Sequence, residues 1–170
     1  MPDFELQFPP DEIDALARRF AYDEDPECIA AGAAAAARGS YTREEFLRVC
    51  GWKSARSRPL LQSNDALTVE ADTRAAFETS DETARMVALC GLRGVGVPIA
   101  SALLHFAFPD RYPILDVRAL ESLGRKGRSV YPVSFWVGYV HACRGLAAER
   151  GVSLRTLDKA LWQHSKENTA

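Results

Sequence analysis

The chain has 170 residues, of which 47% are hydrophobic and 26% are charged. This composition excludes a disordered or low-complexity protein and predicts one compact domain over residues 1–170, because the chain can bury a sizeable core. The most continuous apolar stretch covers residues 97–108. It is well short of the ~20 residues that span a membrane, so no membrane partner is expected. The acidic start lacks the basic and apolar regions of a secretory signal, which predicts a cytoplasmic protein.

The formal net charge of −2 conceals an uneven distribution along the sequence. Residues 1–27 hold nine acidic side chains and two arginines, a net charge of −7, so the other 143 residues carry +5. Basic residues in this larger part gather at residues 43–58 and 111–128. They form either ordinary solvated helix faces or a surface that meets nucleic-acid phosphates.

The cysteines and histidines do not indicate a metal site. They are scattered and include no Cys-x-x-Cys pair: Cys28, Cys50, Cys90, Cys143, His105, His141 and His164. These separations suit neither a zinc site nor an iron–sulfur cluster, so we expect no bound transition metal and no cofactor.

Apolar residues recur with helical periodicity through most of the first half of the chain. Such a pattern predicts helices over residues 11–22 and 26–38, the second ended by Gly39. Thr42 and Glu45 have the spacing of a capping box ahead of a third helix, and Pro59 marks a turn after it. Thr79 and Glu82 repeat the capping-box spacing before a helix that ends near Gly91.

The second half is also helical in pattern. Residues 97–108 are apolar all round, which predicts a helix at the centre of the core. A short helix is expected over 116–123, followed by a basic loop, a helix whose first turn holds Pro132, and a last helix capped by Ser153. The sequence therefore predicts an all-α fold of about eight helices.

The segment Leu92-Arg93-Gly94-Val95-Gly96-Val97-Pro98 carries the strongest functional signal. Two glycines in a short turn allow positive φ angles and direct backbone N–H groups outward, beside the positive end of the following helix. Such a turn can cradle an anion such as a DNA phosphate, or it can be only a tight connection between two helices.

Residues 83–124, about a quarter of the chain, resemble the helix-hairpin-helix superfamily of base-excision DNA glycosylases. Leu92, Gly94, Val95, Gly96 and Ala100 match the hairpin, and Asp116 follows Gly96 by 20 residues, the separation that the family uses. The resemblance implies that the hairpin binds double-stranded DNA. The implied contacts come from Arg93, Gly94, Val95, Gly96, Val97 and Ser101.

The resemblance further implies that Asp116 is the catalytic carboxylate. An ionised carboxylate beside a flipped nucleotide can stabilise the positive charge that develops on the sugar and orient a water toward C1′. The alternative is that Asp116 only caps the helix after it. The bifunctional branch of the family has a lysine where this sequence has Pro98, which favours a monofunctional enzyme without lyase activity.

The base pocket falls outside the matched segment. Candidates are residues able to stack on a base, read its polar edge or fill the gap in the duplex: Trp52, Lys53, Arg56, Gln62, Asn64 and Tyr112. Packing of Trp52 in the core and capping of a helix by Ser63 or Asn64 are the alternatives. The excised base stays open, among oxidised, alkylated and deaminated bases and modified bases of foreign DNA such as that of a phage.

These observations predict a monomeric, nucleoid-associated DNA glycosylase, with a monovalent cation at the hairpin carbonyls as a family inference. Two other functions remain open. One is a non-catalytic helix-hairpin-helix module that binds DNA for repair or replication. The other is a helical interaction protein whose acidic segment, residues 1–27, meets a basic partner.

Overall fold

A computed structural model describes residues 3–22 and 25–169. Within these ranges the chain forms ten α-helices, two short 3-10 helices and no strand, which confirms the all-α prediction. The helices are η1 (Pro10–Glu12), α1 (Ile13–Arg18), α2 (Pro26–Arg38), α3 (Arg43–Lys53), η2 (Ala55–Ser57), α4 (Arg58–Gln62), α5 (Ala66–Glu78), α6 (Glu82–Cys90), α7 (Val97–Ala107), α8 (Val117–Ser122), α9 (Val133–Arg150) and α10 (Leu154–Asn168).

Several predicted helix ends are confirmed by local hydrogen bonds. Thr42 and Glu45 form the expected capping box at the start of α3. The Ser153 hydroxyl accepts the N–H of Thr156 at the start of α10, and Gly39 ends α2 in the left-handed conformation with φ 94°. These ends are set by residues close together in the sequence, which is why the sequence identifies them.

Three local predictions are wrong. Pro59 does not mark a turn but lies in the first turn of α4, where a missing N–H costs no hydrogen bond. Thr79 does not cap α6: the cap is Asp81, whose own N–H is accepted by the Thr79 hydroxyl at 3.1 Å. The first helix ends at Arg18 rather than near residue 22, which leaves Phe20 and Tyr22 beyond it.

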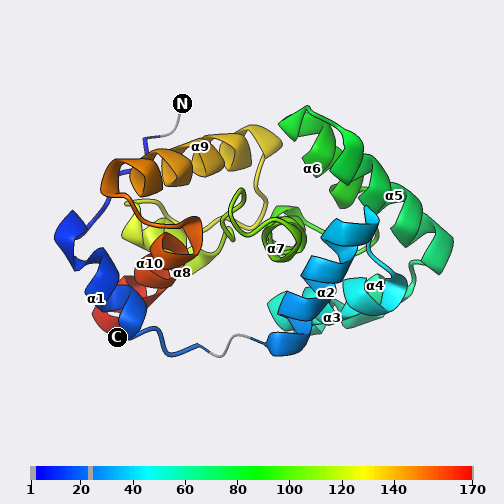
Figure 1. The fold of residues 1–170 in the computed structure, drawn as a ribbon, viewed down its shortest axis with the longest axis horizontal. Coiled ribbons are helices and arrows are strands. Elements are labelled where there is room, and N and C mark those ends of the chain that lie inside the picture. The colour runs from blue at the N-terminus through cyan, green and yellow to red at the C-terminus, as the bar shows by residue number, and fades with distance from the viewer. Residues whose placement is uncertain (1–2, 23–24, 170) are drawn as a thin grey trace.

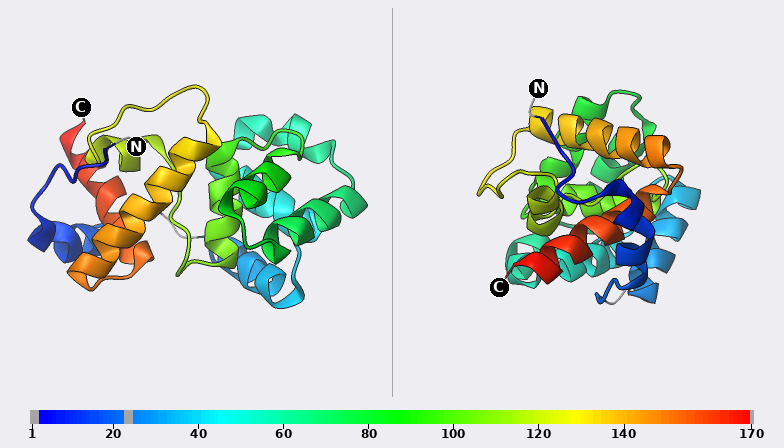
Figure 2. Two further views of the ribbon diagram at one scale, coloured as in Figure 1. Left: turned by 90° about the horizontal axis from the view of Figure 1, so that it is seen from above. Right: turned by 90° about the vertical axis from the view of Figure 1, so that its left-hand side faces the viewer.

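The prediction of a central apolar helix is confirmed by α7, in which every residue except Pro98 is buried. Two groups of helices lie on either side of it (Figure 1): α2 to α6 on one side, and α1, α8, α9 and α10 on the other. Both views in Figure 2 show that α10 runs beside α1 and α8, as their contacts require. Helix α7 packs against α2, α3 and α6 of the first group, and Ser101 of α7 is hydrogen-bonded to Leu115, just before α8 of the second group.

The close approach of α2 to α7 depends on Gly32. A Cβ at this position would lie 2.0 Å from the carbonyl oxygen of Phe106. The absence of a side chain lets the two helix backbones pack against each other, and this contact joins the first group of helices to α7.

Among the described residues, no helix is both long enough and apolar enough to cross a membrane. Of the acidic segment 1–27, residues 1–2 and 23–24, including Asp23 and Glu24, lie outside the described residues. Two of its other acids act within the fold: Asp25 caps α2, and Glu27 forms an ion pair with Arg48.

Candidate functional site

The turn between α6 and α7 has the local geometry that its two glycines permit. Gly94 has φ 79°, and a Cβ there would meet the Leu60 side chain at 3.0 Å, so both its conformation and its surroundings require glycine. Gly96 lies at the exposed start of α7, where the nearest atom to a built Cβ is 3.8 Å away. Gly96 is therefore open to solvent at the positive end of a helix of 11 residues.

Asn64 holds this turn in place. Its side-chain oxygen accepts the N–H of Arg93, and its amide nitrogen donates to the carbonyl oxygen of Arg93, both at 2.9 Å. The same nitrogen donates to the carbonyl of Leu61. Asn64 is 5% exposed, so its amide is already paired and does not line the cavity described below. The contacts of Asn64 therefore indicate that it fixes the turn, in contrast to the predicted role of reading a base.

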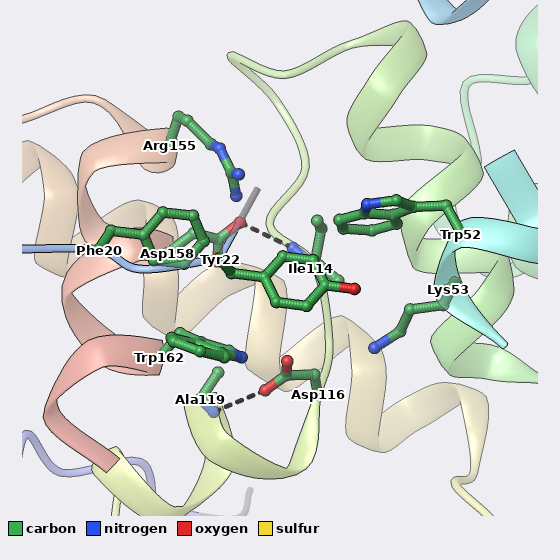
Figure 3. A pocket seen from close by; sticks show the side chains of 10 residues that line it. All are labelled: Phe20, Tyr22, Trp52, Lys53, Ile114, Asp116, Ala119, Arg155, Asp158 and Trp162. Atoms are coloured by element: carbon green, nitrogen blue, oxygen red, sulfur yellow. Dashed lines mark hydrogen bonds between the residues drawn. The ribbon is translucent and has the colours of Figure 1, made fainter. Parts of the chain in front are cut away.

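Asp116 begins α8 and lies at the edge of a cavity. One carboxylate oxygen accepts the N–H of Ala119 at 2.9 Å, and Figure 3 shows the carboxylate at the cavity wall. The preceding residue, Leu115, is fixed from α7: its N–H is accepted by the hydroxyl of Ser101 at 2.9 Å. The capping alternative for Asp116 is therefore correct as a description of its local bonding, and it leaves the carboxylate accessible.

The cavity has a volume of about 220 Å³ and lies between the two groups of helices. Its walls come from four segments far apart in the sequence: the residues after α1, the end of α3, the segment from residue 114 into α8, and α10. The lining residues are Phe20, Tyr22, Trp52, Lys53, Ile114, Asp116, Ala119, Arg155, Asp158 and Trp162. Two of the predicted base-pocket residues, Trp52 and Lys53, thus share one cavity with Asp116 (Figure 3).

Aromatic rings form much of this cavity. Tyr22 lies between two tryptophans, with its ring centroid 5.6 Å from that of Trp52 and 5.6 Å from that of Trp162. Trp52 also packs edge-on against Phe106 of α7, at 5.0 Å. Trp52 is half-buried: one part of its ring packs on the core, as its core alternative predicts, and another part lines the cavity. Stacking of Trp52 on a base stays a prediction.

Two ionisable side chains in the cavity are perturbed by burial. Burial raises the pKa of Asp158 to about 7, although the N–H of Ile114, donated to its carboxylate at 3.0 Å, acts in the opposite direction. Burial lowers the pKa of Lys53, and the nearby carboxylates of Asp116 and Asp158 oppose that shift. In proteins, carboxylates that lie close to one another and amines that are shielded from water often perform proton transfer or nucleophilic attack.

Four other predicted residues do not line this cavity. Tyr112 is fully buried, stacks on Trp136 and donates its hydroxyl to the Glu82 carboxylate at 2.9 Å, so it belongs to the core. Ser101 is also fully buried and cannot contact DNA with its side chain. Gln62 lines a separate surface depression, and Arg56 is exposed on η2, away from the cavity.

The predicted hairpin residues divide by exposure. The side chain of Arg93 and the backbone of Gly96 are exposed, Gly94 is half-buried, and the side chains of Val95 and Val97 are buried. A DNA contact from either valine would therefore use its backbone. A monovalent cation at the hairpin carbonyls stays a prediction.

Sequence reasoning missed Phe20, Tyr22, Asp158 and Trp162 as cavity residues. Phe20 falls inside the helix that the sequence predicts over residues 11–22, whereas α1 ends at Arg18. The sequence position of Asp158 does indicate a special role, because this acid lies next to Leu157 on the buried stripe of α10. A charged residue in such a stripe is unusual unless it is paired or functional.

Among the described residues, no three His, Cys, Asp or Glu side chains lie close enough together to hold a metal ion. The four cysteines are free, and Cys28, Cys50 and Cys143 are buried. The side chains that line the cavity are aromatic, carboxylate, cationic and aliphatic.

Comparison of the chain with protein-family models, with curated proteins and with solved structures finds no significant match.

Proposed function

We propose that the protein is a DNA glycosylase that hydrolyses the bond between a flipped base and its sugar. One observation carries this proposal: the carboxylate of Asp116 lies at the wall of an aromatic-lined cavity, at the start of α8 and tied through Leu115 to the helix that follows the hairpin turn. In the proposed complex, a base held by the aromatic walls would present its glycosidic bond to Asp116.

The size and lining of the cavity support a planar ring as the ligand. A cavity of ~150 Å³ lined by apolar residues is known to hold benzene. The cavity here measures about 220 Å³, so it has room for a ligand a few heavy atoms larger than benzene. The rings of Tyr22, Trp52 and Trp162 lie around it. Aromatic side chains stack on every nucleobase because every base has a π face.

The proposed reaction uses Asp116 in two ways. As the base departs, positive charge develops on the sugar ring, and an ionised carboxylate close to C1′ stabilises that charge. The same carboxylate can orient a water for attack on C1′, which leaves an abasic site. The hydrogen bond from the N–H of Ala119 holds the carboxylate in a fixed direction.

DNA would be held by the hairpin turn. Gly96 is exposed at the N-terminus of α7, Arg93 is exposed in the same turn, and backbone N–H groups at a helix N-terminus bind phosphate. Such contacts fix the position of the duplex without reading its sequence, so the choice of base would depend on the cavity.

The test is a base-release assay on a panel of duplexes that carry oxidised, alkylated, deaminated or other modified bases, followed by alkali to cleave abasic sites. We expect release of one class of base by the wild-type protein and a loss of at least ~100-fold in the Asp116→Asn variant. Asparagine is also a good N-cap, so the variant should keep its fold and its DNA affinity.

Asp65→Asn is the matched control, because Asp65 caps α5 outside the cavity in the same way. It should release bases at the wild-type rate. If Asp116→Asn and wild type release the base equally fast, the catalytic assignment of Asp116 is wrong.

A non-catalytic DNA-binding module is the second candidate. It is favoured by the capping bond of Asp116, since that bond alone would explain an aspartate at this position. Tight binding to duplexes without release of any base, by wild type and Asp116→Asn alike, would establish this function instead.

A further inference from the structure

Lys53 brings a primary amine into the cavity from the side opposite Asp116. It is the last residue of α3, and Figure 3 shows its side chain extending from the α3 wall toward Asp116 on the α8 wall. Among the described residues that line the cavity, Lys53 is the only lysine. The other cation there is Arg155, whose guanidinium is not a nucleophile at neutral pH.

The burial of Lys53 in the cavity wall disfavours its charged form. Burial lowers the pKa of its ammonium group, against the opposing influence of Asp116 and Asp158. Its Nζ forms no ion pair or hydrogen bond within the described part of the chain. An amine must lose its proton before it can attack carbon, and desolvation is how proteins prepare a lysine for that role.

We propose that Lys53 is the nucleophile of a second activity, the cleavage of the DNA strand at an abasic site. The inference rests on the proposed function, because the abasic sugar is the product that base release leaves in this cavity. The expectation of an enzyme without lyase activity came from Pro98, which places no amine at the hairpin. The fold instead supplies an amine from α3, a segment 45 positions earlier in the chain.

Each bond in the proposed reaction is accounted for. The neutral Nζ of Lys53 forms a bond to C1′ of the ring-opened sugar, and the carbonyl oxygen takes up protons and leaves as water, giving an iminium ion. Asp116 then accepts a proton from C2′, the electron pair forms the C2′=C3′ double bond, and the 3′ phosphate leaves with the electrons of the broken C3′–O bond. Water finally hydrolyses the iminium ion and restores the amine, so no oxidant or reductant is consumed.

The alternative role for Lys53 is a purely electrostatic one. An ammonium group at this position could hold a DNA phosphate or keep the carboxylate of Asp116 ionised. An arginine would serve that purpose equally well, whereas it cannot form an imine. The Lys53→Arg variant therefore separates the two roles.

The experiment traps the imine with sodium borohydride. The probe is a duplex with a single abasic site made beforehand from uracil by a separate enzyme, so the substrate does not depend on the base preference of this protein. We expect a covalent protein–DNA adduct with wild type, and mass spectrometry of its peptides should locate the DNA remnant on Lys53. The wild-type peptide map tests the inference even if a variant folds poorly.

The matched pair of variants is Lys53→Arg and Lys126→Arg. Lys126 is exposed in the loop after α8, outside the cavity, so its replacement removes an amine without touching the proposed site. Adduct yield and strand cleavage should fall at least ~10-fold in Lys53→Arg and stay within ~2-fold in Lys126→Arg. Equal adduct yields from both variants, or an adduct mapped to another amine, would overturn the inference.

Failure of this inference differs from failure of the proposed function. Base release without any adduct on the abasic duplex would overturn the role of Lys53 and leave the glycosylase proposal intact. An adduct on Lys53 without release of any base from the panel would support the inference and contradict the proposed base hydrolysis.

Discussion

The hydroxyl of Ser101 accepts the backbone N–H of Leu115 at 2.9 Å and donates to the carbonyl of Pro98 at 2.7 Å. One fully buried side chain thus joins the start of α7 to the residue that precedes Asp116. Because α7 begins at the hairpin turn, this bond links the proposed DNA-binding turn to the proposed catalytic carboxylate.

Ser101→Ala should remove this link and leave the N–H of Leu115 buried without a partner. An unpaired buried N–H costs ~1–3 kcal/mol, so the free energy of unfolding in urea should fall by that amount. Base release at saturating protein should slow as well, because the segment that carries Asp116 is less firmly held. Ser80→Ala, at an exposed serine before α6, should change neither quantity. Unaltered stability of Ser101→Ala would contradict the role of this bond.

Gly96→Asp should weaken binding to any DNA duplex. The position is exposed and free of close contacts, so the substitution should fold normally and place a negative charge at the proposed phosphate site. Gly96→Asn is the control of equal size without the charge. At low salt we expect about tenfold weaker binding of the aspartate variant than of the asparagine variant, and a smaller difference at high salt, in fluorescence anisotropy titrations. Equal affinities would show that the turn does not face DNA.

The buried carboxyl of Asp158 should make stability fall as the pH rises. Burial raises its pKa to about 7, opposed by the N–H of Ile114 and by Arg155 and Lys53, and assisted by Asp116. His105 also faces it, with its Nδ1 at 3.8 Å. An unfolded aspartate loses its proton near pH 4, so between pH 4 and pH 7 the folded state retains a proton that the unfolded state has released.

It follows that the free energy of unfolding decreases with rising pH across this window, by up to about 4 kcal/mol from this group. Asp158→Asn keeps an oxygen for the N–H of Ile114 and has no proton to lose, so its stability should be flatter between pH 4 and pH 7. Urea unfolding at intervals of pH measures both proteins, with Asp14→Asn, an exposed acid of α1, as the control. Parallel curves for wild type and Asp158→Asn would contradict the raised pKa.

Alanine at two glycines should have opposite effects on stability. Gly32→Ala places a methyl group against the carbonyl of Phe106 and should destabilise the protein by ~1–3 kcal/mol, because the backbones of α2 and α7 must separate. Gly145→Ala on α9 meets nothing within 4 Å and should stabilise the protein by ~0.5–1 kcal/mol through helix propensity. Thermal unfolding of the two variants provides the comparison, and a shift of the same sign in both would contradict the close packing at Gly32.

Much of the fold follows from local patterns in the sequence. The all-α class, the capping box at Thr42, the cap at Ser153 and the apolar helix over residues 97–108 each depend on residues within one or two turns of one another. The tight turn at Gly94 and the capping position of Asp116 are local features too. The chemistry of neighbouring residues was sufficient to predict these elements from the sequence.

The cavity depended on contacts that no local pattern contains. Helical periodicity predicts that a face is buried, but it does not say which faces meet, so Tyr112 could not be distinguished from Trp52 before their neighbours were known. The structure places Tyr112 against Trp136 in the core and leaves Trp52 beside Tyr22 at the cavity. The sequence alone determined the helices and the turn, whereas tertiary packing of distant segments decided that Lys53, Asp116 and Asp158 line one cavity.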